Sequence, residues 1–347
     1  MKKYLLYIVC LIFLSCSVIS CTKKSDDSGR NDKSQQTNEQ GDESQNKSAG
    51  RTVSDTVFFG RWDGKRVIVD DYYKYNSNES LRDSTGAGYD KYGIRLIEII
   101  SKYQKYDEKQ LEYFFDDYKP EFAGYTSFKK SDKVYISASS GVYTAEVTGY
   151  YINMDDMIGA GTIFYAMVTP TAGAKFDENE IVVCSFNNNM SAVNRKGVTN
   201  QTVIDDFKKL VMPKLKGVTI SEYNDKGEPK TIPLTKISNE DIKIFEGSFT
   251  GKGKSEFLVS VRLQNDFTNF TSLIYVMDAE GKIISEFIPL TVNNFTFSMA
   301  EGVVDMNGDG TLEVITYDGY YEGGGYNLNK YNGGLWKALT TGFVFGV

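Results

Sequence analysis

Oxygen-bearing side chains alternate along one short segment near the end of this 347-residue chain, in a spacing that suits a bound cation. Hard cations such as Ca²⁺ take about six to eight oxygen ligands, and a loop with an oxygen at every second position can supply several of them. The segment reads Asp305-Met306-Asn307-Gly308-Asp309-Gly310-Thr311-Leu312-Glu313. It predicts a calcium site whose ligands are the side chains of Asp305, Asn307, Asp309 and Glu313 and the main-chain carbonyl of Thr311.

Two other interpretations of this segment are an EF-hand loop and a turn without a metal. An EF-hand loop needs a bidentate carboxylate at its twelfth position, where this chain has Thr316, and a helix afterwards, where Val314–Tyr317 is typical of a strand. The pattern therefore argues against an EF-hand or dockerin-type loop. Asn-Gly and Asp-Gly pairs also form ordinary turns without a metal. In that interpretation the presence of Asp305 and Glu313 at the first and ninth positions would be a coincidence.

A second copy of the segment lies upstream. Residues 248–256 align with residues 305–313 at an offset of 57 and preserve two glycines and the final glutamate. Because Ser248, Thr250 and Lys252 replace the three acidic or amide ligands, we expect this copy to bind no cation and Lys252 to pair with Glu256. Residues 156–163 form a weaker third copy, with the first acid and both glycines.

On these residues the chain resembles the FG-GAP or VCBS class of repeats, which occurs in integrin-like β-propellers and in many exported bacterial proteins. In that class, a loop of this pattern between two strands of a blade holds Ca²⁺. Asp305, Asn307, Asp309, Thr311 and Glu313 match the motif position by position, and Gly302-Val303-Val304 matches the apolar approach to it. The resemblance covers residues 240–347 and implies blade-like β-repeats there.

The N-terminus is typical of a bacterial lipoprotein leader. Lys2 and Lys3 precede an apolar run, Tyr4–Leu14, that is shorter than an ordinary membrane-spanning helix. Val18-Ile19-Ser20-Cys21 resembles a lipobox, which implies cleavage after residue 20 and lipidation of Cys21. Cys16 is an alternative cleavage site. The expected location is the cell envelope, with the outer membrane or the cell surface favoured.

The rest of the chain divides by composition into a tether and two domains. Residues 22–54 are mostly polar and charged, which predicts a disordered tether. Together with the lipidated cysteine, the tether covers residues 21–54. Residues 55–216 predict an α+β domain, and residues 217–347 predict a β-repeat domain with the calcium loop. The fold expected is therefore mainly β with a few helices, and a complete β-propeller with degenerate N-terminal blades is the alternative.

Several elements can be placed within 55–216. The spacing of apolar residues predicts helices over Tyr92–Tyr103, from Asp107 to Tyr118, and after Thr202 as N-cap. Hairpins are expected around Asp63-Gly64 and Ser140-Gly141.

Composition excludes some functions. Histidine is absent, which rules out His-based triads and His-ligated zinc. Loss of residues 1–20 removes Lys2 and Lys3 and changes the net charge from −7 to −9, which argues against nucleic acid as a partner. Cys184 is the one cysteine beyond the leader and lies in an apolar run, so we expect a buried structural thiol.

The function expected from these features is non-catalytic. The chain would be a lipid-anchored envelope protein with a structural Ca²⁺ loop, and its β-repeats would bind protein or glycan or act as a scaffold. The alternative is a glycan-binding or carboxylate-based glycan-hydrolysing protein, for which Tyr320, Tyr321 and Tyr326 could offer aromatic faces to a sugar. The acid pairs at 70–71, 116–117, 155–156 and 205–206 are candidate carboxylates for such chemistry, although a solvated or loop role is expected for most of them.

Overall fold

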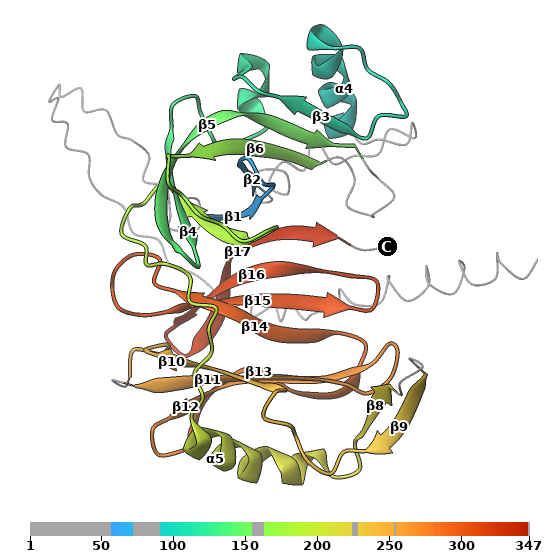
Figure 1. Cartoon of the computed structure of the whole chain (residues 1–347), viewed down its shortest axis with the longest axis vertical. Helices are drawn as coiled ribbons and strands as arrows, with labels where there is room; N and C mark the ends of the chain where they lie inside the picture. The colour runs from blue at the N-terminus through green and yellow to red at the C-terminus, as the bar shows by residue number, and fades with distance from the viewer. Residues whose placement is uncertain (1–56, 72–90, 155–162, 224–227, 253–254, 346–347) are drawn as a thin grey trace, which may run out of the picture. The chain divides into compact units, whose positions relative to one another are not determined.

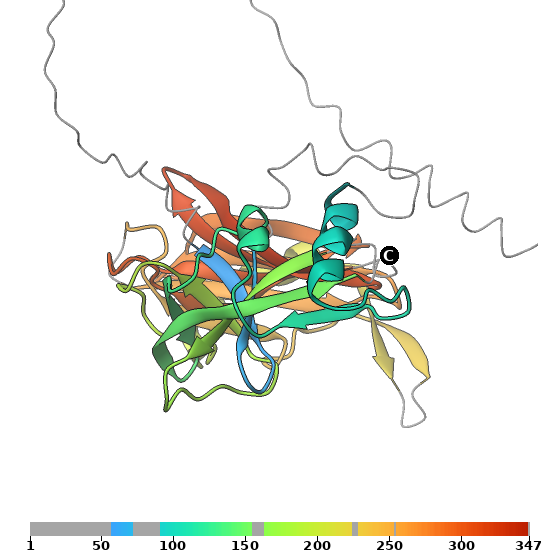
Figure 2. The same cartoon turned by 90° about the horizontal axis from the view of Figure 1, so that it is seen from above.

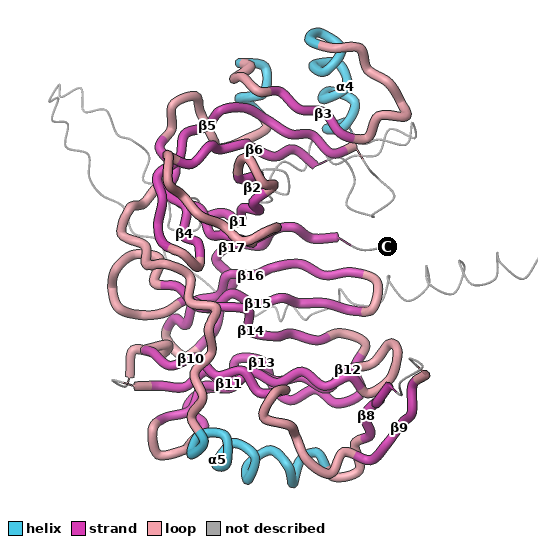
Figure 3. Tube along the Cα trace, in the orientation of Figure 1, coloured by secondary structure: helices cyan, strands magenta, loops and turns pink. Residues whose placement is uncertain are grey.

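The computed structural model describes residues 57–71, 91–154, 163–223, 228–252 and 255–345, all within one compact unit. Antiparallel strands dominate this part of the chain and its helices are few (Figures 1 and 3). The helical segments are α4 (Lys91–Tyr103), η2 (Pro120–Gly124), α5 (Gln201–Val211) and η4 (Met212–Leu215). The expected mainly β fold with a few helices is confirmed.

Seven strands from the first half form one antiparallel sheet, in the order β3-β5-β4-β7-β1-β2-β6. Because β5 also pairs with β6, the pairings of six of these strands close into a circuit. The bounds are β1 Val57–Trp62, β2 Val67–Asp70, β3 Glu112–Phe115, β4 Lys133–Ala138, β5 Gly141–Asn153, β6 Ile163–Pro170 and β7 Ile181–Ser185. The two hairpins predicted in this region are β1–β2 and β4–β5. Cys184 lies fully buried in β7. Burial raises the pKa of its thiol, which disfavours the reactive thiolate and agrees with the expected structural role.

The three predicted helices have different outcomes. The helix over Tyr92–Tyr103 is confirmed as α4, whose Leu96 and Ile100 are fully buried. The helix from Asp107 to Tyr118 is wrong: residues 112–115 form β3, which pairs with β5. Tyr113 and Phe115 are buried there, whereas Glu112 and Phe114 are exposed, and this alternation is that of a strand with one buried face.

The predicted helix after Thr202 exists, but its N-cap is Asn200 and not Thr202. α5 begins at Gln201, and the side chain of Asn200 accepts a hydrogen bond from the Val203 N–H at 3.2 Å. Asn200 is therefore the N-cap, because its carboxamide oxygen satisfies an amide that has no partner within the helix.

Two four-stranded antiparallel sheets follow, each with its strands in chain order. The first contains β10 Ile242–Gly247, β11 Glu256–Gln264, β12 Phe270–Asp278 and β13 Ile283–Asn294. The second contains β14 Phe297–Val304, β15 Glu313–Tyr320, β16 Gly323–Asn332 and β17 Leu335–Phe345. Gly247 pairs with Glu256 in the first sheet and Val304 with Glu313 in the second, so the two aligned sequence segments occupy the same place in their sheets.

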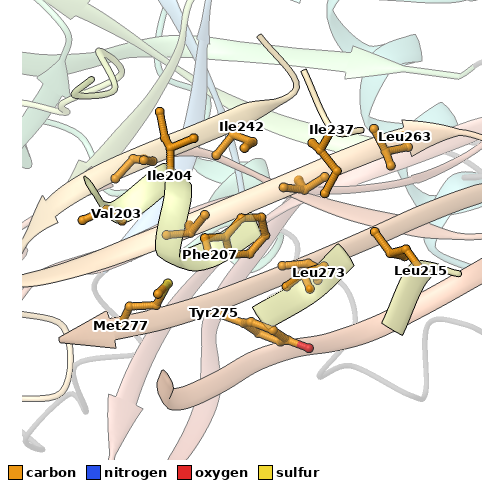
Figure 4. Packing of buried hydrophobic residues seen from close by; sticks show 14 of the residues in the cluster. Val203, Ile204, Phe207, Leu215, Ile237, Ile242, Leu263, Leu273, Tyr275 and Met277 are labelled. Atoms are coloured by element: carbon orange, nitrogen blue, oxygen red, sulfur yellow. The ribbon is translucent and has the colours of Figure 1, made fainter. Parts of the chain in front are cut away.

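Helix α5 packs on the first of these sheets. Its buried face forms a hydrophobic cluster with β10, β11 and β12, seen in Figure 4. The residues labelled there include Val203, Ile204 and Phe207 from α5, Leu215 from η4, and Leu273, Tyr275 and Met277 from β12. The cluster also contains Val218 and Leu234, so the domain boundary expected between residues 216 and 217 falls inside it.

The remaining strands, β8 (Thr219–Tyr223) and β9 (Pro229–Pro233), form a hairpin that projects beside the larger sheets and is drawn in yellow in Figure 2. The strands before α5 belong to the seven-stranded sheet and, among the residues placed by the structure, add no four-stranded unit like the two at the C-terminus. The alternative of a complete propeller therefore gains no support. None of the described helices is long and apolar enough to cross a membrane.

Candidate metal centre

The predicted calcium loop connects β14 to β15, and its last residue is buried. Glu313 is the first residue of β15 and is only 1% exposed. Its Oε2 accepts a hydrogen bond from the Met306 N–H at 2.9 Å, and its Oε1 lies 2.8 Å from the Lys330 ammonium. Burial raises the pKa of the Glu313 carboxyl, in spite of the opposing effect of Lys330. Glu313 therefore points under the loop and fixes its second residue.

Asp305, the first residue of the loop, closes the loop on itself. Its Oδ1 accepts the N–H groups of Asn307 at 3.2 Å and Gly308 at 2.7 Å, and its Oδ2 accepts that of Gly310 at 2.8 Å. Gly308 and Gly310 have φ values of 75° and 80°, in the left-handed region that favours glycine. One carboxylate thus gathers three main-chain amides and sets the course of the loop.

Successive hydrogen bonds connect the residues in the middle of the loop. The Asn307 carboxamide donates to Asp309 Oδ2 at 2.9 Å, and Asn307 Oδ1 accepts the Asp309 N–H at 3.1 Å. Asp309 Oδ1 in turn accepts the Thr311 N–H at 2.7 Å. The structure therefore brings Asp305, Asn307, Asp309 and Thr311 into one hydrogen-bonded turn, with Glu313 beneath it.

Lys330 of β16 supplies the positive charge of this site. Its ammonium lies 2.8 Å from Glu313 Oε1 and 3.3 Å from Asp309 Oδ2, and its side chain is 26% exposed. Burial alone would lower the pKa of Lys330, but the hydrogen bonds and charges of Glu313 and Asp309 outweigh it and raise that pKa. Partial burial likewise acts against the Asp309 carboxylate, and its bonds to Asn307, Thr311 and Lys330 lower its pKa all the same.

The loop fits a calcium ion in the kind of its ligands but not fully in their arrangement. Three carboxylates, an amide oxygen and a main-chain carbonyl are what a hard cation prefers. Yet each carboxylate oxygen already accepts a hydrogen bond, and among the described residues no three acidic, histidine or cysteine side chains converge as a metal-holding group. The Lys330 ammonium contacts two of the predicted ligands, so a cation would have to displace it.

Neighbouring segments hold the loop in place from both sides. Ser191 donates its N–H to the Asp305 carbonyl at 2.8 Å, and its hydroxyl accepts the Asp305 N–H at 2.9 Å. At the other end, the Leu312 N–H donates to the carbonyl of Ser248 at 2.7 Å. Because Ser248 begins the upstream copy, the two loops are directly connected.

The upstream copy keeps the buried glutamate and little else. Glu256 is fully buried, and its Oε2 accepts the N–H groups of Phe249 at 2.6 Å and Thr250 at 2.7 Å. The Thr250 hydroxyl donates to Oε1. The expected pairing of Lys252 with Glu256 is not among the ion pairs of the described residues; the Lys252 ammonium lies 5.8 Å from the centre of the Tyr331 ring instead.

Other buried carboxylates serve the fold in the same way. Asp70 accepts the N–H of Phe343, Asp71 that of Ser127, and Glu180 those of Ser139 and Asp177. Of the other acid pairs, Asp116 and Asp117 form ion pairs with Arg66 and Lys119, and Asp206 pairs with Lys209. The pair at 155–156 and most of the third copy at 156–163 lie outside the described residues, as do Cys16 and Cys21.

The three tyrosines of the sugar hypothesis separate. Tyr320 and Tyr321 meet at the β15–β16 hairpin with ring centroids 6.2 Å apart. Tyr326 packs inside, against Phe59 at 6.0 Å and Tyr317 at 5.2 Å, so it takes no part in an exposed group with the other two.

Searches of protein-family models, curated proteins and solved structures find no match for this chain. The FG-GAP or VCBS resemblance thus remains a prediction from the motif. Sequence reasoning missed Lys330, whose signal was weak: it lies opposite Glu313 only because Val314 pairs with Asn329 in the β15–β16 hairpin.

Proposed function

We propose that this chain is a lipid-anchored, non-catalytic protein of the bacterial envelope, whose calcium-stabilised β-repeats are used for binding or as a scaffold. One observation carries the proposal. Two successive four-stranded sheets have a loop of equal length between their first and second strands, and each loop is fixed from below by a buried glutamate, Glu256 or Glu313. Units repeated in this way, like propeller blades, offer a rigid surface to a partner.

Calcium would bind to the second of these loops. Asp305, Asn307, Asp309, the Thr311 carbonyl and Glu313 would hold it. The ion would supply positive charge at a loop where carboxylates otherwise repel one another. Since Lys330 must leave Asp309 and Glu313 first, we expect a dissociation constant of about 10⁻⁴ to 10⁻³ M, the range of extracellular calcium modules.

The anchor would be a lipid on Cys21. A tether over residues 22–54, rich in polar and charged residues, would give the folded part its reach from the membrane, with the outer membrane or the cell surface as the location. Lipid chains of this kind give stable attachment when more than one is present.

Among the alternatives, glycan hydrolysis gains least support. A glycosidase needs two carboxylates facing one sugar, whereas the buried acids of this chain are bound to main-chain amides of the fold. A binding role needs no such pair, and the partner is then expected to be a protein or glycan rather than nucleic acid.

Two measurements test the proposal. Cells that express the chain are labelled with a palmitate analogue, and we expect Cys21→Ser to abolish the label while Cys16→Ser retains it. The melting temperature of the purified protein is then compared in calcium and in chelator. A label that survives Cys21→Ser would refute the anchor, and equal melting temperatures would refute the calcium brace.

A further inference from the structure

Four aromatic side chains from three separate connections meet on the surface of the two C-terminal sheets. Phe267 belongs to the β11–β12 hairpin, Phe295 to the β13–β14 connection, and Tyr320 and Tyr321 to the β15–β16 hairpin. The Phe295 ring lies 5.6 Å from that of Tyr320 and 5.1 Å from that of Tyr321, and Phe267 lies 6.4 Å from Tyr321. We call these four residues the aromatic surface.

Three of the four residues of the aromatic surface are exposed, and Tyr320 is partly buried. Phe267 is 75% exposed, Phe295 45% and Tyr321 40%. A single exposed aromatic residue needs no explanation, but a contiguous group of them is typical of a binding site. Because successive connections of an antiparallel sheet alternate between its ends, this surface lies at the end opposite the loops that begin at Ser248 and Asp305.

The hairpin that presents Phe267 is held rigidly. Asp266 Oδ1 accepts the N–H groups of Thr268 and Asn269, each at 2.8 Å, and the Asn265 N–H donates to the Asn269 carbonyl at 2.9 Å. These bonds place Phe267 at the tip of a closed turn. A turn whose main chain is fixed in this way loses little conformational entropy when its tip binds a ligand.

The strands beneath the surface are anchored by a buried aromatic pair. Phe270 and Phe297 lie 4.6 Å apart and are 3% and 7% exposed. The Arg262 guanidinium covers both rings, at 4.9 Å from Phe270 and 4.2 Å from Phe297. The exposed rings therefore stand on a fixed base.

The side chains around the rings indicate the chemistry of the ligand. Residues 264–269, 292–296 and 318–323 contain amides, hydroxyls and carboxylates but no lysine or arginine. Asp266, Asp318 and Glu322 give these connections three negative charges, against the one guanidinium of Arg262 on the strands beneath. This balance disfavours an anionic ligand such as a phospholipid headgroup, nucleic acid or the acidic peptide stems of peptidoglycan. The amides and hydroxyls suit a ligand with many hydroxyl groups.

We propose that the aromatic surface binds a neutral glycan from outside the cell. The partly positive C–H groups on one face of a pyranose ring would pack against the negative faces of the aromatic rings. The flanking Asn294 and Thr296 would hydrogen-bond to the sugar hydroxyls. This inference rests on the proposed binding role and names its ligand class, but it depends neither on calcium nor on the lipid anchor.

The test is binding of the purified full-length protein to an array of neutral oligosaccharides, namely β-linked glucans, mannans and N-acetylglucosamine oligomers. Peptidoglycan fragments and phosphatidylcholine vesicles are included as other probes. We expect at least one neutral oligosaccharide to bind, with its affinity lowered about tenfold or more by Phe267→Ala combined with Tyr321→Ala. Phe267→Leu should also weaken binding, because leucine preserves apolar area but has no ring face.

Leu335→Ala is the matched control, since Leu335 is 67% exposed and lies in the β16–β17 hairpin at the other end of the sheet. It should leave glycan binding unchanged, and thermal melting of all variants should stay close to that of the wild type. The proposal is overturned if no neutral glycan binds, if binding is confined to peptidoglycan or vesicles, or if the double variant only abolishes self-association in sedimentation. Calcium binding and palmitate labelling are scored separately, so a failure here is distinct from failure of the proposed function.

Discussion

The two loops that begin at Ser248 and Asp305 differ in their exposed side chains and agree in their buried one. In both, a glutamate at the ninth position accepts the N–H of the second residue, Phe249 or Met306. Only the later loop has acids at its first and fifth positions, and only there, in the described part of the chain, does a lysine from a neighbouring strand, Lys330, contact the fifth-position acid and the glutamate. The upstream loop keeps its glutamate although it lacks the other predicted ligands.

This difference separates folding from ion binding. The glutamate is present in both loops, so its role is one that both loops share, namely to connect two strands around a buried carboxylate. Glu313 is therefore first a structural brace, and the proposed binding of calcium would depend on Asp305, Asn307 and Asp309. The same comparison identifies Lys330 as the cation that contacts Asp309 and Glu313 in the later loop and has no counterpart among the ion pairs of the described residues of the upstream one.

The largest effect is expected from removing the shared glutamate. Glu256→Ala removes the acceptor of the buried Phe249 N–H and of the partly buried N–H and hydroxyl of Thr250, and a donor left without a partner costs roughly 1–3 kcal/mol when it is buried. We expect a loss of about 4 kcal/mol in the free energy of unfolding, and about 2 kcal/mol for Glu313→Ala, in urea denaturation. The exposed Glu246→Ala is the control, and a Glu256 variant as stable as that control would contradict the brace.

A smaller effect is expected from Lys330. Lys330→Met leaves the Glu313 carboxylate buried without its cation, and we expect a loss of about 1–2 kcal/mol in chelator, since the lysine is partly solvated. In titrations, calcium affinity should rise about tenfold, because the competing ammonium is gone. The exposed Lys337→Met serves as control. Unchanged affinity would show that Lys330 does not compete with the ion.

The stabilisation by Lys330 should be lost at alkaline pH. Its pKa is raised in the folded state, so its contribution is fully present below the unfolded pKa of about 10.4 and is lost as pH rises through the folded value. The difference in unfolding free energy between the wild type and Lys330→Met should therefore be constant from neutral pH to about pH 10 and shrink above it. A difference that persists at higher pH would argue that Lys330 acts through packing.

The smallest change in stability is expected from making the upstream loop resemble the later one. Ser248→Asp combined with Lys252→Asp introduces two carboxylates and removes the Lys252 ammonium, which in the wild type lies over the Tyr331 ring. Calorimetry should then find a second calcium site per chain. An unchanged stoichiometry would mean that the side chains at these positions do not decide which loop binds the ion.

Local patterns predicted the elements that local chemistry decides. Gly64 marked a hairpin, and the apolar spacing over Tyr92–Tyr103 marked a helix. The spacing of Leu111, Phe114 and Phe115 also suits a helix, but pairing with β5 buries Tyr113 and Phe115 on one side and makes a strand. Asn200 and Thr202 are both good caps, and only the start of the buried face at Val203 decides between them.

The residues of the candidate site could be located from the sequence, but their arrangement could not. The spacing located Asp305, Asn307, Asp309, Thr311 and Glu313 in one loop, as the structure places them. Strand register decides whether Glu313 faces the loop or the core. It also brings Lys330 of β16 next to Glu313. The aromatic surface likewise joins residues from three connections that only the sheets bring together.

Calcium titration by calorimetry tests the comparison most directly. We expect one site per chain in the wild type, no detectable site when Asp305→Asn and Asp309→Asn are combined, and a retained site in Lys252→Ala, which changes only the upstream loop. Absence of binding in the wild type at millimolar calcium, or binding that survives the loss of both aspartates, would contradict the assignment of calcium to the loop between β14 and β15.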